Sequence, residues 1–347
     1  MQIAANSAKI RARAPLRLGL AGGGTDLSPY CDQFGGAVLN VTIDRYAFAT
    51  CTPRDDGRIV FDADDLGLSE DWLPGQEASG QLKLHQAVYS RMIREFGSGQ
   101  PIPVTLRSTV DAPAGSGLGS SSALVVALVD VMRELLDAPL GVYDVARIAY
   151  EIERIELQLS GGRQDQYAAA FGGMNFIEFL AGDRVVVNPL RAHRSVICEL
   201  ESSIVTCFSG TSRESATIID QQKSAMSGPA TPAIDAMHCL KRDAIDMKQA
   251  FVSGAIERMA EILHSSWQAK KSTAKSISNP RIEQLLELGL QNGALAGKVS
   301  GAGGGGFMFF LVHPENRYRL ISALNHAGGQ AGTVKFTEIG CETWRFV

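Results

Sequence analysis

The sequence predicts a two-domain protein that combines helices and strands. Its 347 residues, 45% of them hydrophobic and 20% charged, are enough to form two globular cores. Segments with strand patterns and segments with helical periodicity occur in both halves of the chain. Strand patterns at 174–179 and 185–189 close the first half, and a new series of elements begins near Ser195. We therefore expect one domain over residues 1–195 and a second over residues 196–347.

The composition limits the partners that the protein can have. A net charge of −4 gives no general attraction to nucleic acid or to an anionic membrane, so we expect a small-molecule partner. No stretch reaches about 18 uninterrupted apolar residues, the length expected of a membrane helix. The six cysteines form no C-x-x-C pair, which is typical of thiols in a reducing compartment. We expect a cytoplasmic protein, and the sequence is compatible with a homo-oligomer without indicating one.

The stretch 113–122, PAGSGLGSSS, predicts an anion-binding loop. It follows a strand pattern at 104–110 and leads into an apolar helical segment. The first N–H groups of a helix have no intrahelical partner, and the helix dipole adds partial positive charge there. A phosphate can therefore lie against the backbone of Gly117, Gly119 and Ser120, where a Cβ would hinder its approach.

Two well-known phosphate loops do not fit this stretch. A Walker A loop needs a lysine directly before its serine, but Gly119 precedes Ser120. A dinucleotide fingerprint needs a third glycine where Ser120 stands after Gly115 and Gly117. A turn whose serines only cap a helix would explain one serine, but not the glycines followed by three serines.

A second glycine-rich turn follows the first strand pattern, at 9–20. Arg17 and Asp26 flank the glycines of the sequence AGGGTD. A fixed cation and a fixed carboxylate beside exposed backbone suit a polyhydroxylated ligand, with Asp26 accepting from two adjacent hydroxyls. The alternative is an Asx turn at Asp26 and an arginine at the surface. Lys9, Arg11 and Arg13 share one strand face, which is either solvated or part of a pocket for an anionic group.

Two acidic residues near the middle of the chain are candidates for chemistry. Asp165 follows the turn GGRQ and precedes a short helix, where an acidic residue is also a common helix cap. Glu153 lies on the preceding helix, predicted over 142–159, and is otherwise one of several surface charges. His85, on a helix predicted over 82–96, is interpreted as a packing residue because no carboxylate orients it locally.

The last glycine cluster, within 298–307, contains a G-x-G-x-x-G match at Gly301, Gly303 and Gly306. A dinucleotide site needs these glycines between a strand and a helix, whereas a strand pattern follows them here. A glycine hairpin packed against a ligand or against another loop fits better. An NAD-dependent dehydrogenase stays open as an alternative on this motif alone.

Three stretches together, 14–26, 113–122 and 298–307, resemble the motifs of the GHMP kinases, a family named for galactokinase, homoserine kinase, mevalonate kinase and phosphomevalonate kinase. Their order and wide separation are more specific than any one motif, and the resemblance covers essentially the whole chain. It implies an α+β fold of two domains. The N-terminal domain would resemble ribosomal protein S5, the C-terminal domain would be ferredoxin-like, and the active site would lie in the cleft between them.

The resemblance also implies a set of site residues. Ser121 and Glu153 would hold Mg²⁺, Asp165 would face the acceptor hydroxyl, Arg17 would lie beside it, and Asp26 would hold sugar hydroxyls. The residues implied for ATP are Pro113, Gly115, Ser116, Gly117, Leu118, Gly119, Ser120, Ser121 and Ser122. Those implied for the sugar are Gly23, Gly24, Thr25, Asp26, Gly303 and Gly304, with Arg163 and Arg213 as candidate cations for a phosphate on it.

Within the family, the stretches at 21–27, 35–40 and 161–173 are most similar to the kinases of D-glycero-D-manno-heptose 7-phosphate. That likeness implies transfer of the ATP γ-phosphate to the C1 hydroxyl, which gives the 1,7-bisphosphate for nucleotide-activated heptose and surface polysaccharide. A fucose- or galactose-like acceptor is the alternative. Galactose itself fits poorly, because galactokinases carry Glu-His where Gly22, Gly23 and Gly24 stand.

Overall fold

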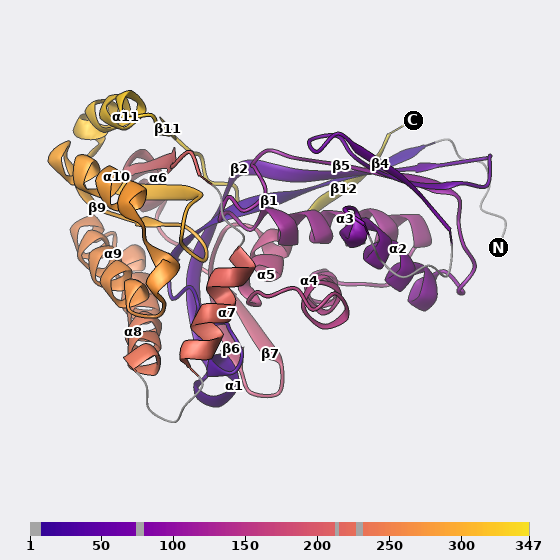
Figure 1. Ribbon diagram of the computed structural model, residues 1–347, viewed down its shortest axis with the longest axis horizontal. Coiled ribbons are helices and arrows are strands. Elements are labelled where there is room, and N and C mark those ends of the chain that lie inside the picture. Colours follow the sequence, from indigo (N-terminus) through magenta and orange to yellow (C-terminus); the bar gives the residue numbers. More distant parts are fainter. Residues whose placement is uncertain (1–7, 74–79, 212–214, 227–231, 347) are drawn as a thin grey trace.

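The computed structural model describes residues 8–73, 80–211, 215–226 and 232–346 and contains two sheets (Figure 1). The larger sheet has eight strands in the order β12-β1-β2-β5-β3-β4, with β6 paired to β2 and β7 paired to β6. Its pairs are antiparallel except β3 with β5. The strands are β1 Lys9–Ala21, β2 Gly36–Pro53, β3 Ile59–Ala63, β4 Leu68–Trp72, β5 Val104–Val110, β6 Met174–Leu180, β7 Arg184–Pro189 and β12 Glu342–Phe346.

Apolar and basic side chains alternate along the first half of β1, which explains its place in the sheet. Ile10, Ala12 and Ala14 are buried in the core, whereas the intervening basic residues lie on the opposite face. There Arg13 pairs with Glu342 of β12, 2.6 Å away. Arg11 lies over the ring of Phe346 in the same neighbouring strand, and Lys9 is exposed. None of the three basic residues lines the cavity described below.

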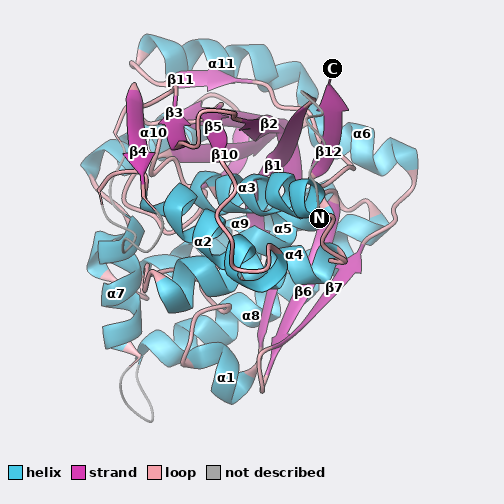
Figure 2. Cartoon of the chain, turned by 90° about the vertical axis from the view of Figure 1, so that its right-hand side faces the viewer, coloured by secondary structure: helices cyan, strands magenta, loops and turns pink. Residues whose placement is uncertain are grey.

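Helices of the first half pack on one face of the larger sheet (Figures 1 and 2). The helix α3 lies against β1 and β2 and is almost wholly buried, as its apolar sequence requires. The segment predicted as one helix over 142–159 differs: α4 ends at Tyr150 and continues as a π-helical turn, Glu151–Glu156, which carries Glu153. The helices are α1 Tyr30–Phe34, α2 Lys83–Phe96, α3 Ser120–Leu136, α4 Val142–Tyr150 and α5 Gln164–Phe171.

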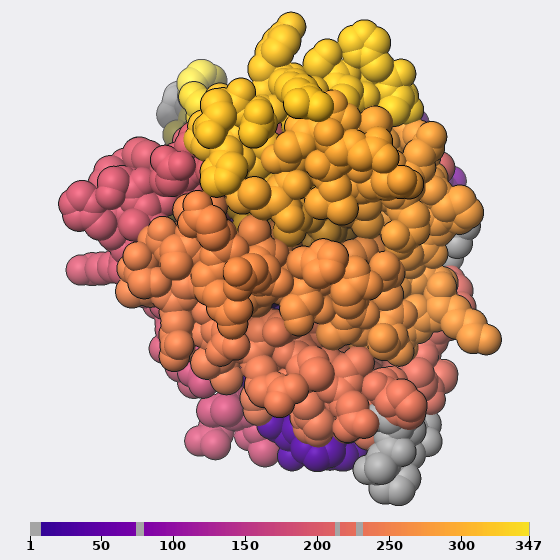
Figure 3. Space-filling view, turned by 90° about the vertical axis from the view of Figure 1, so that its left-hand side faces the viewer, coloured from indigo at the N-terminus to yellow at the C-terminus, as the bar shows by residue number. Residues whose placement is uncertain are grey.

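The second half builds a four-stranded antiparallel sheet, in the order β11-β8-β10-β9, with helices around it. Its strands are β8 Ile204–Phe208, β9 Ala294–Val299, β10 Phe307–Val312 and β11 Gln330–Gly332. Its helices are α6 Arg194–Ser202, α7 Ser215–Ala225, α8 Pro232–Ser253, α9 Ile256–Lys271, α10 Pro280–Gln291 and α11 Arg317–His326, with short 3₁₀ turns at Lys275–Ile277 and Pro314–Asn316. This half forms most of the face seen in Figure 3.

One buried cluster spans the two halves, and a second lies within the second half alone. Leu16 and Val126 from the first half belong to the same buried cluster as Met247 and Phe309 from the second. The helix α8 packs on β1 and β2, and β12 returns from the second half to pair with β1. The boundary near residue 195 stays a prediction. Within the described residues, no helix combines the length and the apolar character needed to cross a membrane.

His85 provides a pH test of the packing in this core. The imidazole is 2% exposed, and its Nε2 lies 2.9 Å from the hydroxyl of Ser108. Burial lowers the pKa of His85 to about 4, from an unfolded value of 6.5. The folded state therefore excludes a proton that the unfolded chain accepts, so this contribution to stability is complete above pH 6.5 and is lost as the pH falls toward 4.

We expect the free energy of unfolding to fall by about 2 kcal/mol between pH 7 and pH 5 because of His85 alone. Urea unfolding at both pH values measures this loss in the wild type and in His85→Gln. Carboxylates titrate in both proteins, so the difference between the two pH slopes isolates the imidazole. Equal slopes would contradict a neutral, buried His85.

Candidate active site

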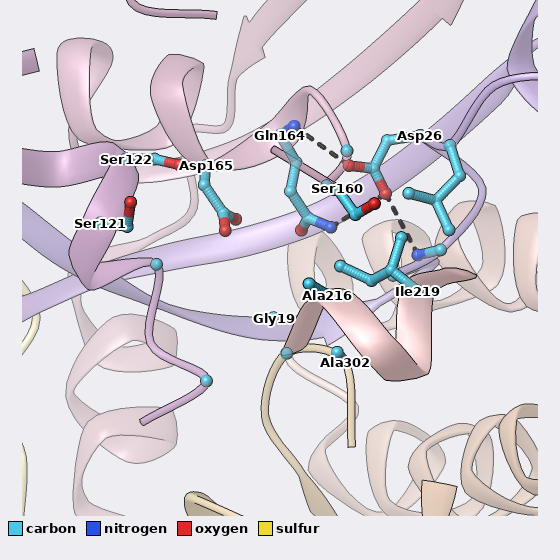
Figure 4. A pocket seen from close by; sticks show the side chains of 18 of the residues that line it. Gly19, Asp26, Ser121, Ser122, Ser160, Gln164, Asp165, Ala216, Ile219 and Ala302 are labelled. Atoms are coloured by element: carbon cyan, nitrogen blue, oxygen red, sulfur yellow. Dashed lines mark hydrogen bonds between the residues drawn. The ribbon is translucent and has the colours of Figure 1, made fainter. Parts of the chain in front are cut away.

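A cavity of about 450 Å³ lies where the glycine-rich segments meet (Figure 4). Its walls come from β1, the turn after it, the loop 115–122, the segment 153–165 and the helices α7 and α9. The third glycine segment adds Gly301 and Ala302. Residues that are far apart in the sequence therefore share one cavity. It contains most of the predicted site residues, with exceptions that follow below.

The loop before α3 presents unpartnered backbone amides to this cavity. Gly115, Gly117 and Gly119 have φ values of 72°, 79° and 76°, a left-handed conformation that other residues adopt at a cost. Gly119 is the N-cap of α3, and no side chain caps the first turn. The alternative in which serines only cap this helix is therefore wrong. Ser120, Ser121 and Ser122, whose amides belong to this uncapped first turn, line the cavity, and an uncapped helix start of this kind can bind phosphate.

The third glycine segment is a hairpin that packs on this loop. It joins β9 to the antiparallel strand β10, and the N–H of Phe307 donates to the carbonyl of Ser116 over 2.8 Å. A Cβ on Gly117 would lie 2.5 Å from the carbonyl oxygen of Ser300. This confirms the predicted glycine hairpin and removes the strand-to-helix context that a dinucleotide site requires.

Two glycines of this hairpin lie elsewhere than predicted. Gly303 and Gly304 do not line the cavity: the N–H of Gly304 donates to the carbonyl of Ile277 over 2.7 Å, and a Cβ on Gly303 would lie 2.8 Å from that same oxygen. Their neighbours Gly301 and Ala302 take the places at the wall. Within the central loop, Pro113, Ser116 and Leu118 likewise lie behind the lining residues.

Arg17 and Asp165 form a charged pair beside the loop 115–122. Two guanidinium nitrogens, Nε and Nη2, lie 2.8 and 2.7 Å from Asp165 Oδ1, and Nη1 donates to the carbonyl of Gly117 over 2.6 Å. Asp165 also lies against Gly119, whose Cβ would come within 3.2 Å of its Cγ. The Asp165 side chain stays 21% exposed to the cavity, whereas that of Arg17 is 5% exposed. The sequence placed these residues 148 positions apart, and the fold brings them together.

Asp26 is a buried acceptor for the protein itself. Its carboxylate accepts from the amides of Gly24, Arg163 and Gln164 and from Gln164 Nε2, over 2.9–3.1 Å. This holds the turn before α5 against the turn after β1, as Figure 4 shows in part. The alternative of a local Asx turn is wrong. Thr25, predicted to touch the sugar, lies behind the cavity, and its hydroxyl donates to backbone carbonyls of Gly22 and Ala37.

Ser121 and Glu153 form an oxygen pair at the same cavity wall. The Ser121 hydroxyl donates to Glu153 Oε1 over 2.8 Å, and Gln166 Nε2 donates to Oε2 over 2.6 Å. Glu153 is fully buried, so it is not the surface glutamate of the alternative interpretation. A hydroxyl and a carboxylate next to a phosphate loop fit Mg²⁺, which takes few protein ligands and completes its shell with phosphates and water. The described residues contain no cluster of three or more His, Cys, Asp or Glu side chains suited to a metal.

Arg163, one of the cations predicted for a substrate phosphate, has protein partners and does not line the cavity. The guanidinium of Arg163 lies 3.1 Å from Asp32 and 2.8 Å from Asp183, stacks over Tyr150, and does not line the wall. Its expected contact with substrate is therefore not found. Arg213 lies outside the described residues.

Two lysines that the sequence analysis missed do line the cavity, Lys270 from α9 and Lys298 from β9. Burial lowers the pKa of Lys270 to about 8, and burial together with the charge of Lys270 lowers that of Lys298 to about 7. Lys298 opens the third motif and could have been found there. Lys270 carries no local signal, because a lysine in the last turn of a helix is common.

Comparison with known proteins finds relatives among the sugar kinases and matches to two GHMP kinase domains. Residues 83–173 match the GHMP kinases N terminal domain, and residues 247–330 match the GHMP kinases C terminal domain. The chain is 43% identical to the D-glycero-alpha-D-manno-heptose 7-phosphate kinase of Campylobacter jejuni, over 97% of this chain and 99% of that one. It is 25% identical to the L-fucokinase/L-fucose-1-P guanylyltransferase of Bacteroides fragilis, over 94% of this chain and 37% of that one.

A solved structure agrees with these relatives. The crystal structure of a D-glycero-D-manno-heptose 1-phosphate kinase from Bacteroides thetaiotaomicron superposes with a TM-score of 0.82 at 40% identity, over 97% of this chain and 99% of that one. The mevalonate kinase of Methanococcus jannaschii superposes with a TM-score of 0.76 at 15% identity, a likeness of fold alone.

The close approach of the two glycine loops can be tested with a pair of matched variants. Gly117 and Gly57 have φ values of 79° and 77°, but an added Cβ meets Ser300 only at Gly117 and nothing within 4 Å at Gly57. We expect Gly57→Ala to cost about 1–2 kcal/mol of stability. Gly117→Ala should cost about 1–3 kcal/mol more and weaken ATP binding. Denaturant unfolding and ATP titration measure both effects, and equal destabilisation by the two variants would contradict this packing.

Proposed function

The chain belongs to the GHMP kinase family, and we propose that it transfers the γ-phosphate of ATP to the C1 hydroxyl of D-glycero-D-manno-heptose 7-phosphate, giving the 1,7-bisphosphate and ADP. One observation carries the proposal: the Asp165 carboxylate, held by Arg17, opens into the cavity directly beside the glycine loop at the start of α3. An acid in that position can act on a hydroxyl next to a bound phosphate.

The nucleotide phosphates would lie against the first turn of α3. The amides of Ser120, Ser121 and Ser122 would donate to phosphate oxygens, and the helix dipole would add to their attraction. Ser121 and Glu153 would hold Mg²⁺, which when bound neutralises charge on the β- and γ-phosphates. Gln166 supports this pair by fixing the second oxygen of Glu153.

The transfer step needs little covalent chemistry from the protein. The sugar hydroxyl gives its proton to Asp165 while its oxygen bonds to the γ-phosphorus, and the bond from that phosphorus to the β–γ bridging oxygen breaks. ADP leaves with that oxygen. Arg17 keeps Asp165 oriented through two contacts to one oxygen, which leaves Oδ2 available to the hydroxyl.

Heptose 1-phosphate and L-fucose are the alternatives for the acceptor. The names of two relatives differ in where the heptose carries its phosphate, at position 7 in one and at position 1 in the other. The fucokinase likeness suggests a free sugar instead, at lower identity. The resemblance of the stretches at 21–27, 35–40 and 161–173 favours the heptose 7-phosphate.

We expect Asp165→Asn to lower kcat by about 10²–10⁴-fold, because the amide cannot accept the hydroxyl proton. The affinity for ATP should stay within a few-fold of the wild type, since Asp165 is not among the groups proposed to hold the nucleotide. Coupled ADP release and ATP titration give the two values. Asp55→Asn, in an exposed turn, is the matched control and should behave as the wild type. An unchanged kcat in Asp165→Asn would refute its role as base.

Substrate identity is tested by supplying ATP with heptose 7-phosphate, heptose 1-phosphate or L-fucose. The two heptose phosphates lead to the same bisphosphate, so consumption of the acceptor, rather than the product, distinguishes them. We expect kcat/KM for heptose 7-phosphate to exceed those for the other two acceptors by at least tenfold, as read from ADP release. A preference for either of the others would replace the proposed acceptor without changing the reaction class.

A further inference from the structure

We propose that Lys270 and Lys298 form a buried cationic pair that binds the phosphate group carried by the acceptor sugar. This inference rests on the proposed function, because it assigns the anionic end of that acceptor. It makes α9 and β9, from the second half of the chain, responsible for the choice of a phosphorylated sugar over a free one.

Lys270 lies between the first and third glycine segments. Its ammonium donates to the carbonyl of Gly301 over 2.6 Å and lies 3.4 Å from that of Gly23. A Cβ on Gly23 would stand 3.6 Å from the ammonium and 3.8 Å from Gln164 Nε2. These are ordinary van der Waals distances, and they place the lysine head in contact range of the turn that also carries Asp26. This part of the wall belongs to the turn predicted to hold the sugar, not to the helix start predicted to hold the nucleotide.

Lys298 supplies the second charge. Its side chain is 3% exposed, its ammonium donates to the carbonyl of Leu20 over 3.3 Å, and it stacks over Phe309. Backbone carbonyls satisfy part of the hydrogen-bonding capacity of both ammonium groups. Among the described residues, neither lysine has a carboxylate oxygen within 4 Å.

Buried charge without a carboxylate in direct contact is costly and needs a reason. Burial lowers the pKa of each lysine, because it outweighs the attraction of Asp26 and Asp165 for Lys270 and that of Asp243 for Lys298. Of the other cations that line the cavity, Arg17 pairs with Asp165 and Arg154 with Glu153 at 3.7 Å, and Lys83 is only partly buried, at the start of α2. The lysine pair is therefore the positive charge in this wall that a bound dianion would neutralise.

The phosphate of the acceptor fits this pair better than the phosphates of ATP do. The nucleotide phosphates already have the amides at the start of α3 as donors. The cations that the sequence analysis named for an acceptor phosphate, where the structure describes them, do not line the cavity. Arg163 is engaged by Asp32 and Asp183. The bond from Lys270 to Gly23 also places it on the turn proposed for the sugar.

The test compares a phosphorylated acceptor with the same sugar lacking its phosphate. In Lys270→Met, which keeps the volume but removes the charge, we expect KM for heptose 7-phosphate to rise by about 10–100-fold. The KM values for ATP and for unphosphorylated heptose should stay within threefold. Lys271→Met is the matched control, because Lys271 pairs with Glu283 on the outside of α9, and it should change none of these values. Equal losses with both acceptors, or a raised KM for ATP, would overturn the proposal.

A binding measurement separates this inference from the proposed function. Inorganic phosphate is titrated calorimetrically into the full chain saturated with ADP and Mg²⁺, in two buffers of different ionisation enthalpy. At pH 8 we expect the wild type to bind phosphate with proton uptake, because a dianion raises the lowered pKa of each lysine. Lys270→Met and Lys298→Met, checked for intact thermal unfolding, should lose this binding. Phosphate binding that survives in both variants would refute the cationic pair, even if the kinase assay with heptose fails in the wild type.

Discussion

The guanidinium of Arg17 is the contact on which the site depends. It joins β1 to the carbonyl of Gly117, 100 residues away, to the carboxylate of Asp165, 148 residues away, and approaches the hydroxyl of Ser300, 283 residues away. A cation that is 4% exposed requires such partners, because burial without them would cost several kcal/mol. The demand of one buried charge for partners therefore fixes the acid, the phosphate loop and the third glycine segment relative to one another.

Glycine serves two purposes around this contact. In the central loop, left-handed φ values turn successive amides toward the cavity. Between loops, glycine permits contacts that a Cβ would prevent. A Cβ on Gly301 would lie 2.7 Å from the carbonyl oxygen of Gly117, and one on Gly162 would lie 1.9 Å from the carboxylate of Asp26. The glycine clusters are thus places where distant segments of the chain approach one another closely.

Three carboxylates of similar chemistry receive different surroundings. Asp26 is surrounded by N–H donors and holds two turns together, and Glu153 is fully buried between Ser121 and Gln166. Asp165 has one oxygen held by Arg17 and keeps contact with the cavity. Because only the last has both a fixed orientation and free space, it is the one suited to receive a proton from a ligand. The carboxylate oxygens of Asp26 already accept hydrogen bonds from the protein, so a sugar hydroxyl that bound there would have to share them with those donors.

The sequence alone determined several strands, among them those at 9–20, 104–110, 174–179 and 185–189, several helices and the three glycine segments, because hydrophobic periodicity and glycine turns are local properties. It also named Arg17, Asp165, Ser121 and Glu153 as site residues, and all four line the cavity. The tertiary structure decided which side chains face the cavity: it turned Arg163 toward Asp32 and Asp183 and brought in Lys270 from α9. It also paired β12, from the end of the chain, with β1 in the larger sheet. These outcomes depend on long-range packing and on how buried charges find partners, and no window of neighbouring residues contains that information.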